Sequence, residues 1–355
     1  MTPTVRALGL GMLLLTMLSA CTLLGSAPAV PAVPTAIGRN AQMSPVIHTL
    51  RGVQQGLKTV FTLPDPVQIK NLVGIQSDVW FSEDTSDRIA KITDQGQYDE
   101  YALPTANARP GWGTSGLNGD FWVSEEGANQ IAQVSSQGDV TEYALPTANA
   151  QPGQMQFWGN MVWFTETGVQ KIGRIDQNNQ IVEFALNGTP DQLATAGSEE
   201  KNGQLWFTEP ASRKVGHITF DGQISEFPFP ASLTSLDALV GDGAGNLWFS
   251  TGQSANNQLG YVTPDGHFTL FSTGRQNVVS QLMQDGDAID FIEQNNNTIW
   301  TINGQGAIQA RFTVPGTLSL PTPLVLDASS GSYWYASTTG AQSQLWKLNI
   351  SPYGP

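Results

Sequence analysis

The chain has 355 residues, with 30 Asp and Glu against 16 Lys and Arg, and its formal net charge at pH 7 is −14. Nucleic acid and anionic membrane surfaces both require a cationic footprint, so this charge argues against either as a bound surface. Cys21 is the single cysteine, which excludes an internal disulfide.

The first 20 residues have the order of a secretory signal peptide. One early charge, Arg6, precedes an apolar run over residues 7–18, which is shorter than the roughly 20 apolar residues of a membrane span. The run ends in Leu-Ser-Ala-Cys at residues 18–21, which resembles the lipobox of bacterial lipoproteins. We therefore expect export and lipidation at Cys21. The alternative is an ordinary signal peptide followed by an incidental cysteine.

The expected location is the bacterial cell envelope, outside the cytoplasm, with membrane contact only through the lipid anchor. Thr22 follows the cysteine, and because it is not Asp it is compatible with release to the outer membrane of a two-membrane bacterium. Residues 21–56 are rich in Ala, Pro, Ser and Thr, a composition that favours an extended tether.

A strand is expected at residues 59–64, directly after the tether. Its sequence, Thr-Val-Phe-Thr-Leu-Pro, repeats a pattern found later in the chain, for example Glu-Tyr-Ala-Leu-Pro at residues 142–146. It comes before the first of the seven repeats described next.

From residue 67 onward the chain repeats one unit seven times. Each unit has a strand centred on a Trp, followed by a short phrase such as Lys-Ile-Gly-Arg-Ile at residues 171–175. The Trp positions are separated by 41 to 44 residues, with Asp290 in the sixth position: Trp80, Trp122, Trp163, Trp206, Trp248, Asp290 and Trp334. A period of roughly 40 to 50 residues with four short strands per unit is the mark of a β-propeller.

The expected fold is all-β, a seven-bladed β-propeller of four-stranded blades. Six outer strands can be counted inside the repeats, and the seventh repeat ends at Asn349-Ile350 without one. An open sheet edge carries unpaired backbone groups, so the N-terminal strand is expected to complete the last blade. The predicted blades are residues 67–104, 108–146, 150–187, 190–230, 234–272, 276–315, and 321–350 together with 57–64.

The repeat phrases resemble those of the virginiamycin B lyase (streptogramin B lyase) family over the whole propeller. The phrases that carry the likeness are Val-Trp-Phe-Thr-Glu at 162–166, Leu-Trp-Phe-Thr-Glu at 205–209, Lys-Ile-Gly-Arg-Ile at 171–175 and Glu-Tyr-Ala-Leu-Pro-Thr at 142–147. The resemblance implies a seven-bladed propeller that opens a cyclic depsipeptide antibiotic by elimination across its ester, with Mg²⁺. Scaffold phrases also recur in relatives with other activities.

The catalytic positions implied by the resemblance are not filled. A general-base histidine is expected at the start of an innermost strand, with a metal-binding glutamate fourteen residues later. In the second repeat this glutamate is Glu125, but the histidine position is Gly111, and in the third repeat it is Gly153. In the other repeats only Asp237 offers a titratable group there. The second metal carboxylate would fall on Arg109 or Gln151, and neither is an acid.

Acids at the ends of the second strands form the remaining candidate site. If the strands run as in relatives, these side chains point toward one mouth of the central channel: Glu83, Glu125, Glu166 and Glu209. They either cap turns or form a cation or polar-ligand site, with Glu125 and Glu166 as ligands of Mg²⁺ or Ca²⁺. Trp112, Trp158 and Arg109 are expected beside them, which would give a small-molecule pocket.

Two classes of function follow. The first is a binding protein that holds a small molecule, or a protein or other cell-envelope partner, at one face of the ring. We expect it to be a monomer. The second is an enzyme: a lyase acting on streptogramin B-type depsipeptides with a relocated base, or a metal-dependent lactonase or esterase. The unfilled histidine positions favour the first class.

Overall fold

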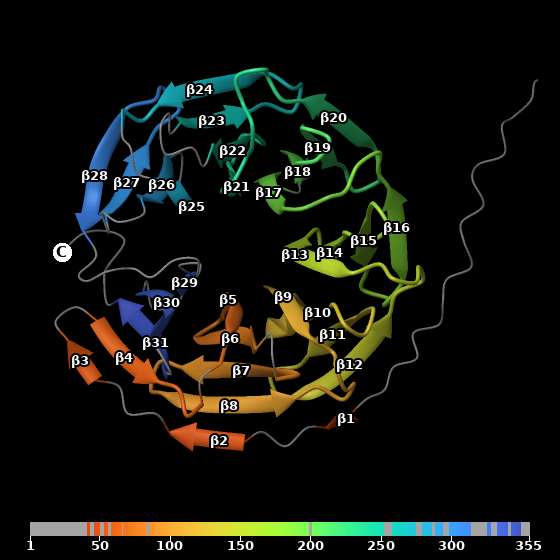
Figure 1. Cartoon of the computed structure of the whole chain (residues 1–355), viewed down its shortest axis with the longest axis vertical. Coiled ribbons are helices and arrows are strands. Elements are labelled where there is room, and N and C mark those ends of the chain that lie inside the picture. The colour runs from red at the N-terminus through yellow and green to blue at the C-terminus, as the bar shows by residue number, and fades with distance from the viewer. Residues whose placement is uncertain are drawn as a thin grey trace, which may run out of the picture. The chain divides into compact units, whose positions relative to one another are not determined.

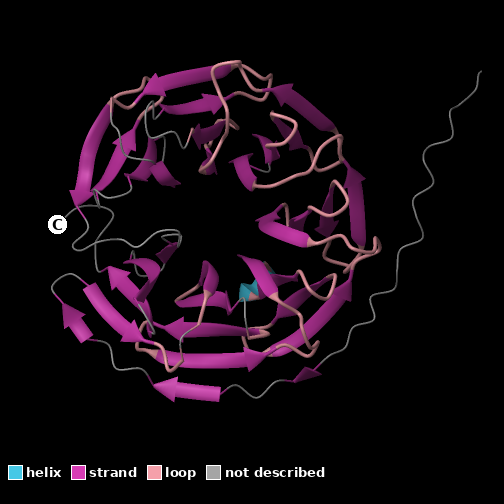
Figure 2. Ribbon diagram, in the orientation of Figure 1, coloured by secondary structure: helices cyan, strands magenta, loops and turns pink. Residues whose placement is uncertain are grey.

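The computed structural model describes residues 41–42, 46–49, 53–55, 58–65, 67–83, 86–198, 201–251, 258–274, 279–285, 288–293, 298–313, 325–327, 332–339 and 342–348. The expected signal peptide, Cys21 and the first half of the expected tether lie outside these residues. The described chain is built of strands, with one short 3₁₀ turn at Leu117–Gly119 (Figure 2). No helix of this part of the chain is long and apolar enough to cross a membrane.

The strands form seven sheets arranged as the blades of a β-propeller, as expected (Figure 1). Each blade is an antiparallel meander that runs outward from the central channel. Blade 1 consists of β5 (Ile69–Ile75), β6 (Asp78–Glu83), β7 (Arg88–Thr93) and β8 (Gln97–Ala102). Blade 2 consists of β9 (Pro110–Ser115), β10 (Phe121–Glu125), β11 (Gln130–Val134) and β12 (Asp139–Ala144).

Blades 3 to 6 follow the same order. Blade 3 has β13 (Pro152–Trp158), β14 (Met161–Glu166), β15 (Lys171–Ile175) and β16 (Ile181–Ala185). Blade 4 has β17 (Leu193–Ser198), β18 (Lys201–Glu209), β19 (Lys214–Ile218) and β20 (Ile224–Pro228). Blade 5 has β21 (Leu239–Gly241), β22 (Leu247–Ser250), β23 (Gln258–Val262) and β24 (Phe268–Ser272). Blade 6 has β25 (Val279–Asp285), β26 (Ala288–Glu293), β27 (Thr298–Ile302) and β28 (Ile308–Thr313).

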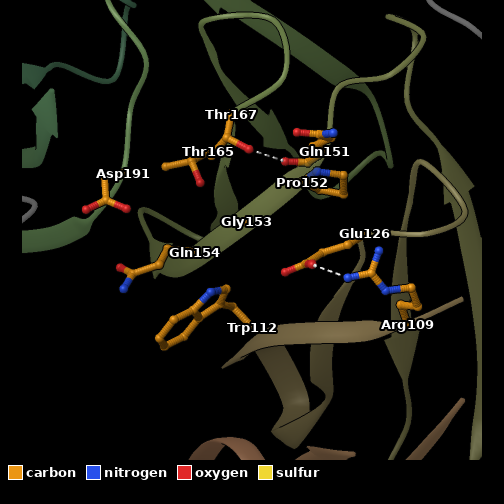
Figure 3. Close-up of a pocket in the computed structure, with 10 residues that line it drawn as sticks. All are labelled: Arg109, Trp112, Glu126, Gln151, Pro152, Gly153, Gln154, Thr165, Thr167 and Asp191. Atoms are coloured by element: carbon orange, nitrogen blue, oxygen red, sulfur yellow. Dashed lines mark hydrogen bonds and ion pairs between the residues drawn. The ribbon is translucent and has the colours of Figure 1, made fainter. Parts of the chain in front are cut away.

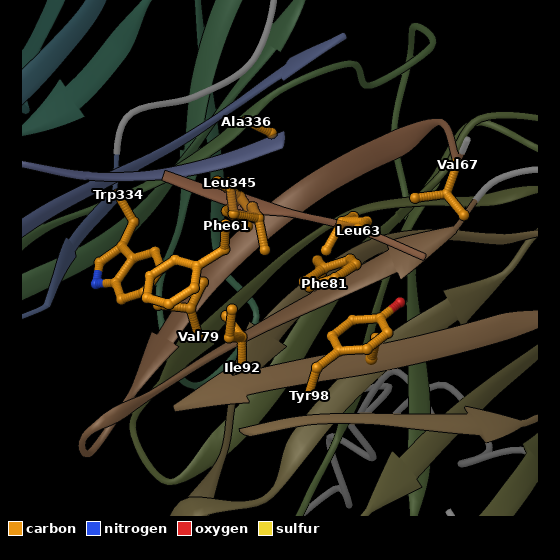
Figure 4. Close-up of a cluster of buried hydrophobic side chains, with 12 residues drawn as sticks. Phe61, Leu63, Val67, Val79, Phe81, Ile92, Tyr98, Trp334, Ala336 and Leu345 are labelled. Atoms are coloured by element: carbon orange, nitrogen blue, oxygen red, sulfur yellow. The ribbon is translucent and has the colours of Figure 1, made fainter. Parts of the chain in front are cut away.

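Blade 7 joins the two ends of the propeller sequence, which confirms the expected ring closure. Its strands are β29 (Val325–Asp327), β30 (Ser332–Thr339), β31 (Gln342–Leu348) and, from the N-terminal side, β4 (Lys58–Thr62). β4 pairs antiparallel with β31, with Phe61 opposite Leu345. In Figure 4, Phe61 of this strand and Leu63 just after it lie among side chains of blades 7 and 1.

Three further strands precede β4 and extend three outer edges. β1 (Ala41–Gln42) pairs with β12 of blade 2, β2 (Val46–Thr49) with β8 of blade 1, and β3 (Val53–Gln55) with β4 of blade 7. We call these strands the N-terminal strap. The sequence predicts an extended tether over residues 21–56, and β1, β2 and β3 within this range instead pair with outer edges, where β12, β8 and β4 offer unpaired backbone groups.

The repeated Trp-Phe dipeptide explains how neighbouring blades pack. Successive side chains of a strand point to opposite faces of its sheet, so the Trp and the following aromatic of each second strand face different neighbours. Trp80 of blade 1 stacks on Phe121 of blade 2 at 5.5 Å between ring centroids. Trp206 shares a buried cluster with Phe249 of the next blade, and Trp334 of blade 7 shares one with Phe81 of blade 1.

The small residue of the third-strand phrase makes room for these aromatic rings. Gly173 lies opposite Phe164 in the β14–β15 ladder, and a β-carbon on Gly173 would lie 2.3 Å from the Phe164 ring. Real β-carbons do not approach other atoms so closely, so this position takes glycine here. Gly216 and Gly260 stand in the same relation to Phe207 and Phe249, so the glycine of the phrase is a packing requirement of blades 3, 4 and 5.

Candidate functional site

A pocket of about 330 Å³ opens between the inner ends of blades 2, 3 and 4 (Figure 3). It lies on the face that carries the connections between blades and the turns between second and third strands, which we call the pocket face. Blade 2 contributes Arg109, Trp112 and Glu126, and blade 4 contributes Asp191. Blade 3 contributes Gln151, Pro152, Gly153, Gln154, Thr165 and Thr167.

Two copies of one turn place the pocket residues of blades 2 and 3. The sequences Thr-Ala-Asn-Ala-Arg-Pro-Gly (105–111) and Thr-Ala-Asn-Ala-Gln-Pro-Gly (147–153) lead into β9 and β13. Arg109 and Gln151 both have left-handed backbones, with φ of 49° and 50°. This conformation is unfavourable for a non-glycine residue. In the first turn the Asp87 carboxylate offsets the cost by accepting hydrogen bonds from the backbone N–H of Asn107 (2.7 Å) and of Arg109 (3.0 Å).

The charges of the pocket are distributed unevenly. On the blade 2 side, Arg109 Nη2 lies 3.7 Å from Glu126 Oε2, so the two opposite charges form an ion pair and neutralise each other. On the blade 4 side stands Asp191. Reduced solvation, together with the charge of nearby Asp237, raises the pKa of the Asp191 carboxyl above its ordinary value. Figure 3 shows Asp191 across the pocket from the Arg109–Glu126 pair.

Trp112 supplies the aromatic surface of the pocket. Its side chain is half-buried, and its backbone N–H donates to Ser124 Oγ at 3.0 Å, which fixes β9 against β10. Lys70 of blade 1 places its Nζ 6.0 Å from the centroid of the Trp112 ring, within the range of a cation–π contact. The ring projects into the pocket opposite Thr165 and Thr167 (Figure 3).

Thr165 interrupts a hydrogen-bonding pattern of the blades. The hydroxyl at this position of the second strand normally bonds the backbone of an inner strand: Thr208 accepts from Gln192 N at 3.2 Å, and Ser250 accepts from Ala238 N at 3.1 Å. Thr165 is fully buried and its Oγ1 has no partner among the described residues. An unpartnered buried hydroxyl costs about 1–3 kcal/mol, so this one is a vacant bonding position in the pocket wall.

The strand-end acids do not reach the pocket, which corrects the expectation that they point toward the channel mouth. Glu83, Glu125, Glu166 and Glu209 are all buried inside their blades. Glu125 shares a face of its strand with buried Val123, which packs in the joint with blade 1. A side chain at the end of a strand still points out of the sheet, and in a propeller that direction leads to the neighbouring blade.

These buried acids instead accept hydrogen bonds within their own blade or from a connection between blades. Glu83 accepts from Ser86 Oγ at 2.6 Å and Glu125 from Gln130 Nε2 at 2.9 Å, both within one blade, and Glu209 accepts from the backbone N–H of Gly188, between blades 3 and 4, at 3.0 Å. Neither carboxylate oxygen of Glu166 has a hydrogen-bond partner among the described residues. Burial raises the pKa of Glu125 and that of Glu166 to about 8.

Trp158 also lies away from the pocket, contrary to the expectation. It stands at the far end of β13, about 20 Å along the strand from Pro152 at roughly 3.3 Å per residue. Its ring is buried and stacks on Phe220 at 3.7 Å between centroids. Asp237, the weak candidate for a relocated base, is exposed and does not line the pocket, although its charge acts on Asp191.

Two overlapping stretches of the sequence, residues 49–192 and 159–345, match the model of the Virginiamycin B lyase family. The chain belongs to this family. The lyase-like resemblance of its repeat phrases is thus confirmed. No curated protein matches the sequence significantly.

Solved structures of lyases share the fold with this member of the virginiamycin B lyase family. A streptogramin B lyase is 23% identical with a TM-score of 0.65, covering 83% of this chain and 100% of its own. A catalytically inactive virginiamycin B lyase from Staphylococcus aureus, solved with quinupristin, is 24% identical with a TM-score of 0.66, covering 82% and 99%. YCF48 bound to a peptide is 12% identical with a TM-score of 0.60, covering 84% and 97%.

The histidine positions implied by the lyase resemblance are occupied by neighbouring side chains. A β-carbon on Gly111 would lie 2.7 Å from Glu126 Oε1 and 2.9 Å from Ser124 Oγ. A β-carbon on Gly153 would lie 2.6 Å from Thr165 Oγ1. Both contacts are closer than real β-carbons allow, so an imidazole at either position would require these groups to move.

The histidines within the described residues stand elsewhere. His217 is buried beside Trp206, with its Nε2 3.1 Å from the carbonyl oxygen of Pro264, and burial lowers its pKa. His267 is exposed in the turn between β23 and β24. His48 lies on β2 of the N-terminal strap. None of the three lines the pocket.

The donor set of the pocket does not fit the Mg²⁺ that lyase activity would require. Glu126 is engaged with Arg109, and the next carboxylate, Asp191, stands across the pocket. Glu125 and Glu166, the metal ligands expected from the sequence, are buried in separate blades. In the described part of the chain no three His, Cys, Asp or Glu side chains converge in a way that could hold a metal ion.

Sequence reasoning named Arg109 and Trp112 as pocket residues and Gln151 and Gly153 as unfilled catalytic positions, and it missed the other lining residues. Glu126 follows the Trp-Val-Ser-Glu strand end by one residue, in the turn, where its side chain is free of the sheet faces. Asp191 directly precedes Gln192, near the start of the innermost strand of blade 4. The available signal was the turn residue after each strand end, rather than the strand-end glutamate itself.

Proposed function

We propose that this protein binds a small polar ligand in the pocket between blades 2, 3 and 4, and that it does not catalyse the elimination implied by its family. The pocket combines an aromatic ring, Trp112, with a few convergent polar groups, the composition typical of small-molecule sites. Its lining is mostly short polar side chains and backbone, which suits recognition by hydrogen bonds.

One observation carries the choice of binding over catalysis. In the second and third repeats the position where the family resemblance places the general base holds Gly111 and Gly153, and the side-chain space of these glycines is taken by Glu126 and Thr165. A general base must stand within hydrogen-bond reach of the proton that it removes. No histidine lines this pocket, and the Glu126 carboxylate, which occupies the space beside Gly111, forms an ion pair with Arg109.

The proposal includes a location outside the cytoplasm. The order of Arg6, the apolar run over 7–18 and Leu-Ser-Ala-Cys at 18–21 supports export and lipid anchoring at the cell envelope. A pocket on a surface-anchored ring would sample ligands or partners outside the membrane.

A lyase is the second candidate, because Glu126 occupies the space of the missing base. Its Oε1 lies 2.7 Å from the point where the side chain of residue 111 would begin, so a carboxylate stands where an imidazole would. In this alternative Glu126 would accept the proton during ester elimination. A metal-dependent lactonase or esterase has no donor set in the described residues to support it.

The decisive experiment incubates the purified protein with Mg²⁺ and a type B streptogramin. We expect the antibiotic to stay cyclic, judged by chromatographic mobility because the opened product has the same mass, while an active virginiamycin B lyase opens it in parallel. Loss of a general base alone removes roughly two to four orders of magnitude in rate.

Rapid opening by the wild-type protein that disappears in Glu126→Gln would establish the lyase instead. Binding is tested separately by a thermal-shift screen of small polar compounds. Hits are repeated with Trp112→Ala, which should abolish the shifts. A screen in which Trp112→Ala responds like the wild type would place binding outside this pocket and contradict the proposal.

A further inference from the structure

The two sides of the pocket differ in net charge. The Arg109–Glu126 pair balances itself on the blade 2 side. On the blade 4 side, no ion pair joins Asp191 to a lysine or arginine of the described residues, and the charge of nearby Asp237, which acts on Asp191, has the same sign. A ligand group facing Asp191 therefore meets uncompensated negative charge, which favours a cation and opposes a carboxylate.

The orphaned hydroxyl of Thr165 adds a second requirement. In Figure 3 its oxygen lies between Asp191 and Glu126 and faces the interior of the pocket. The adjacent Thr167 hydroxyl is already engaged, since it donates to the carbonyl oxygen of Gln151 at 3.1 Å. Thr165 Oγ1 has no such bond, so an acceptor on the ligand would recover the cost of burying this hydroxyl.

Trp112 adds a third requirement, an apolar or aromatic portion that packs on its ring. A cavity of about 330 Å³ is small, so one compact molecule must meet all three requirements. A free amino acid carries the cation but also a carboxylate, which the negative side of the pocket would repel. An amino acid whose carboxyl group is an amide keeps the cation and the acceptor and loses the repulsive charge.

We propose that the pocket binds an α-amino amide, such as the N-terminal residue of a peptide, with its ammonium toward Asp191, its carbonyl oxygen accepting from Thr165 Oγ1 and its side chain on Trp112. This rests on the proposed binding function and names its ligand class. Charge-assisted hydrogen bonds are about twice as strong as neutral ones, so the ammonium is expected to dominate the affinity.

The test is calorimetric titration of the purified full protein with three matched probes: L-phenylalaninamide, N-acetyl-L-phenylalaninamide and L-phenylalanine. Titrations are run at a pH of about 6.5, below the ordinary pKa of an α-amino group near 7.7–8.0, so that the amine is protonated. We expect L-phenylalaninamide to bind. The acetylated amide should bind at least about tenfold more weakly, because loss of a charged hydrogen bond costs about 1.5–3 kcal/mol. L-phenylalanine should also bind at least about tenfold more weakly, because its carboxylate meets the uncompensated negative charge of the pocket.

Two substitutions locate the interaction. Asp191→Asn keeps the shape of the side chain and removes its charge. It should lower the affinity for L-phenylalaninamide at least about tenfold. Thr165→Val removes only the hydroxyl and should weaken it about fivefold, the equivalent of roughly 1 kcal/mol. Asp221→Asn, in the exposed turn between β19 and β20 on the opposite face, is the matched control and should bind like the wild type. If Thr165→Val fails to fold, Asp191→Asn decides.

Equal affinity for the amide and its acetylated form, or no effect of Asp191→Asn, would overturn this proposal. If Trp112→Ala abolished the binding of these probes in that case, the pocket would still be a binding site, but for a neutral ligand. Failure of all three probes to bind folded protein would also overturn the amino-amide assignment, while the thermal-shift screen decides the binding function independently.

Discussion

At the scale of single residues, Glu125 acts against the stability of the native state at neutral pH. Burial, together with the charge of Glu142 beside it, raises the pKa of Glu125 from an ordinary value of 4.5 to about 8. The folded protein then holds a proton that the unfolded chain would release between these pH values. The stabilising protonated form is complete below about pH 4.5 and is lost as the pH rises through about 8.

We predict that Glu125→Gln flattens the pH dependence of stability. The amide mimics the protonated acid and can still accept the hydrogen bond from Gln130. The melting temperature of the wild type should decrease as the pH rises from about 5 to about 8.5, and the melting temperature of the variant should decrease less. At pH 8 the variant should melt about 2–4 °C higher, corresponding to about 1 kcal/mol. Circular dichroism melts at several pH values measure this.

Glu126→Gln controls for the change in net charge, because it removes the same charge from the next residue, in the pocket. If both variants shift the curve equally, the effect comes from overall charge and not from the burial of Glu125. Glu166→Gln offers a second case, since burial also raises the pKa of Glu166 to about 8.

The choice between Glu125 and Glu126 also shows where sequence reasoning ends for the site. The repeat register identifies the strand end correctly, and with it the neighbourhood of Arg109 and Trp112. Which side chain enters the pocket depends on the direction that it takes from the backbone, and Glu125 shares the inward-packed face with Val123. Asp191 and Thr165 come from two other blades, and their approach depends on the curvature of the ring.

At the scale of elements, β4 holds the ring closed. It covers the backbone edge of β31, and Phe61 and Leu63 are buried against blades 7 and 1. Leu63 N donates to the carbonyl oxygen of Ser343 at 2.9 Å, which continues the pairing past the end of the strand. Each such apolar side chain contributes about 1.5–3 kcal/mol when it is fully buried.

We predict that deleting residues 59–64 lowers stability far more than deleting residues 22–40. The first deletion exposes the edge of β31 and the apolar surface that Phe61 and Leu63 cover, while the second removes none of these contacts. Melting temperatures of the two deletion variants provide the comparison. Equal melting temperatures would show that β4 does not close the ring in solution.

The elements themselves were predictable where a strand is long and patterned. The seven blades and the closure of blade 7 follow from the repeats, but the strand ends do not: β8 ends at Ala102, although the first predicted blade extends to residue 104. Pro104 cannot donate to a ladder, and Leu103 N bonds the carbonyl oxygen of Asp87 in the connection. The N-terminal strap has strands of two to four residues, too short for a visible alternation.

At the scale of the whole molecule, the sequence predicts an anchored protein. Cys21 follows the apolar run at the spacing of a lipobox. In a bacterial host the wild type should incorporate labelled palmitate and fractionate with membranes. Cys21→Ser should do neither, because the thiol that carries the diacylglycerol is gone. Equal labelling of the two proteins would contradict lipidation at this residue.

Attachment through the N-terminal end would give the strap a mechanical role. A pull from that end reaches β1 first, then β2 and β3, and the closing strand β4 last. The two-residue pairing of β1 and the four-residue pairing of β2 would yield before blade 7 is loaded. Releasing residues 41–49 frees about 30 Å of chain at roughly 3.3 Å per residue. The strap would therefore absorb tension by lengthening, and the ring that shapes the pocket would stay unstrained.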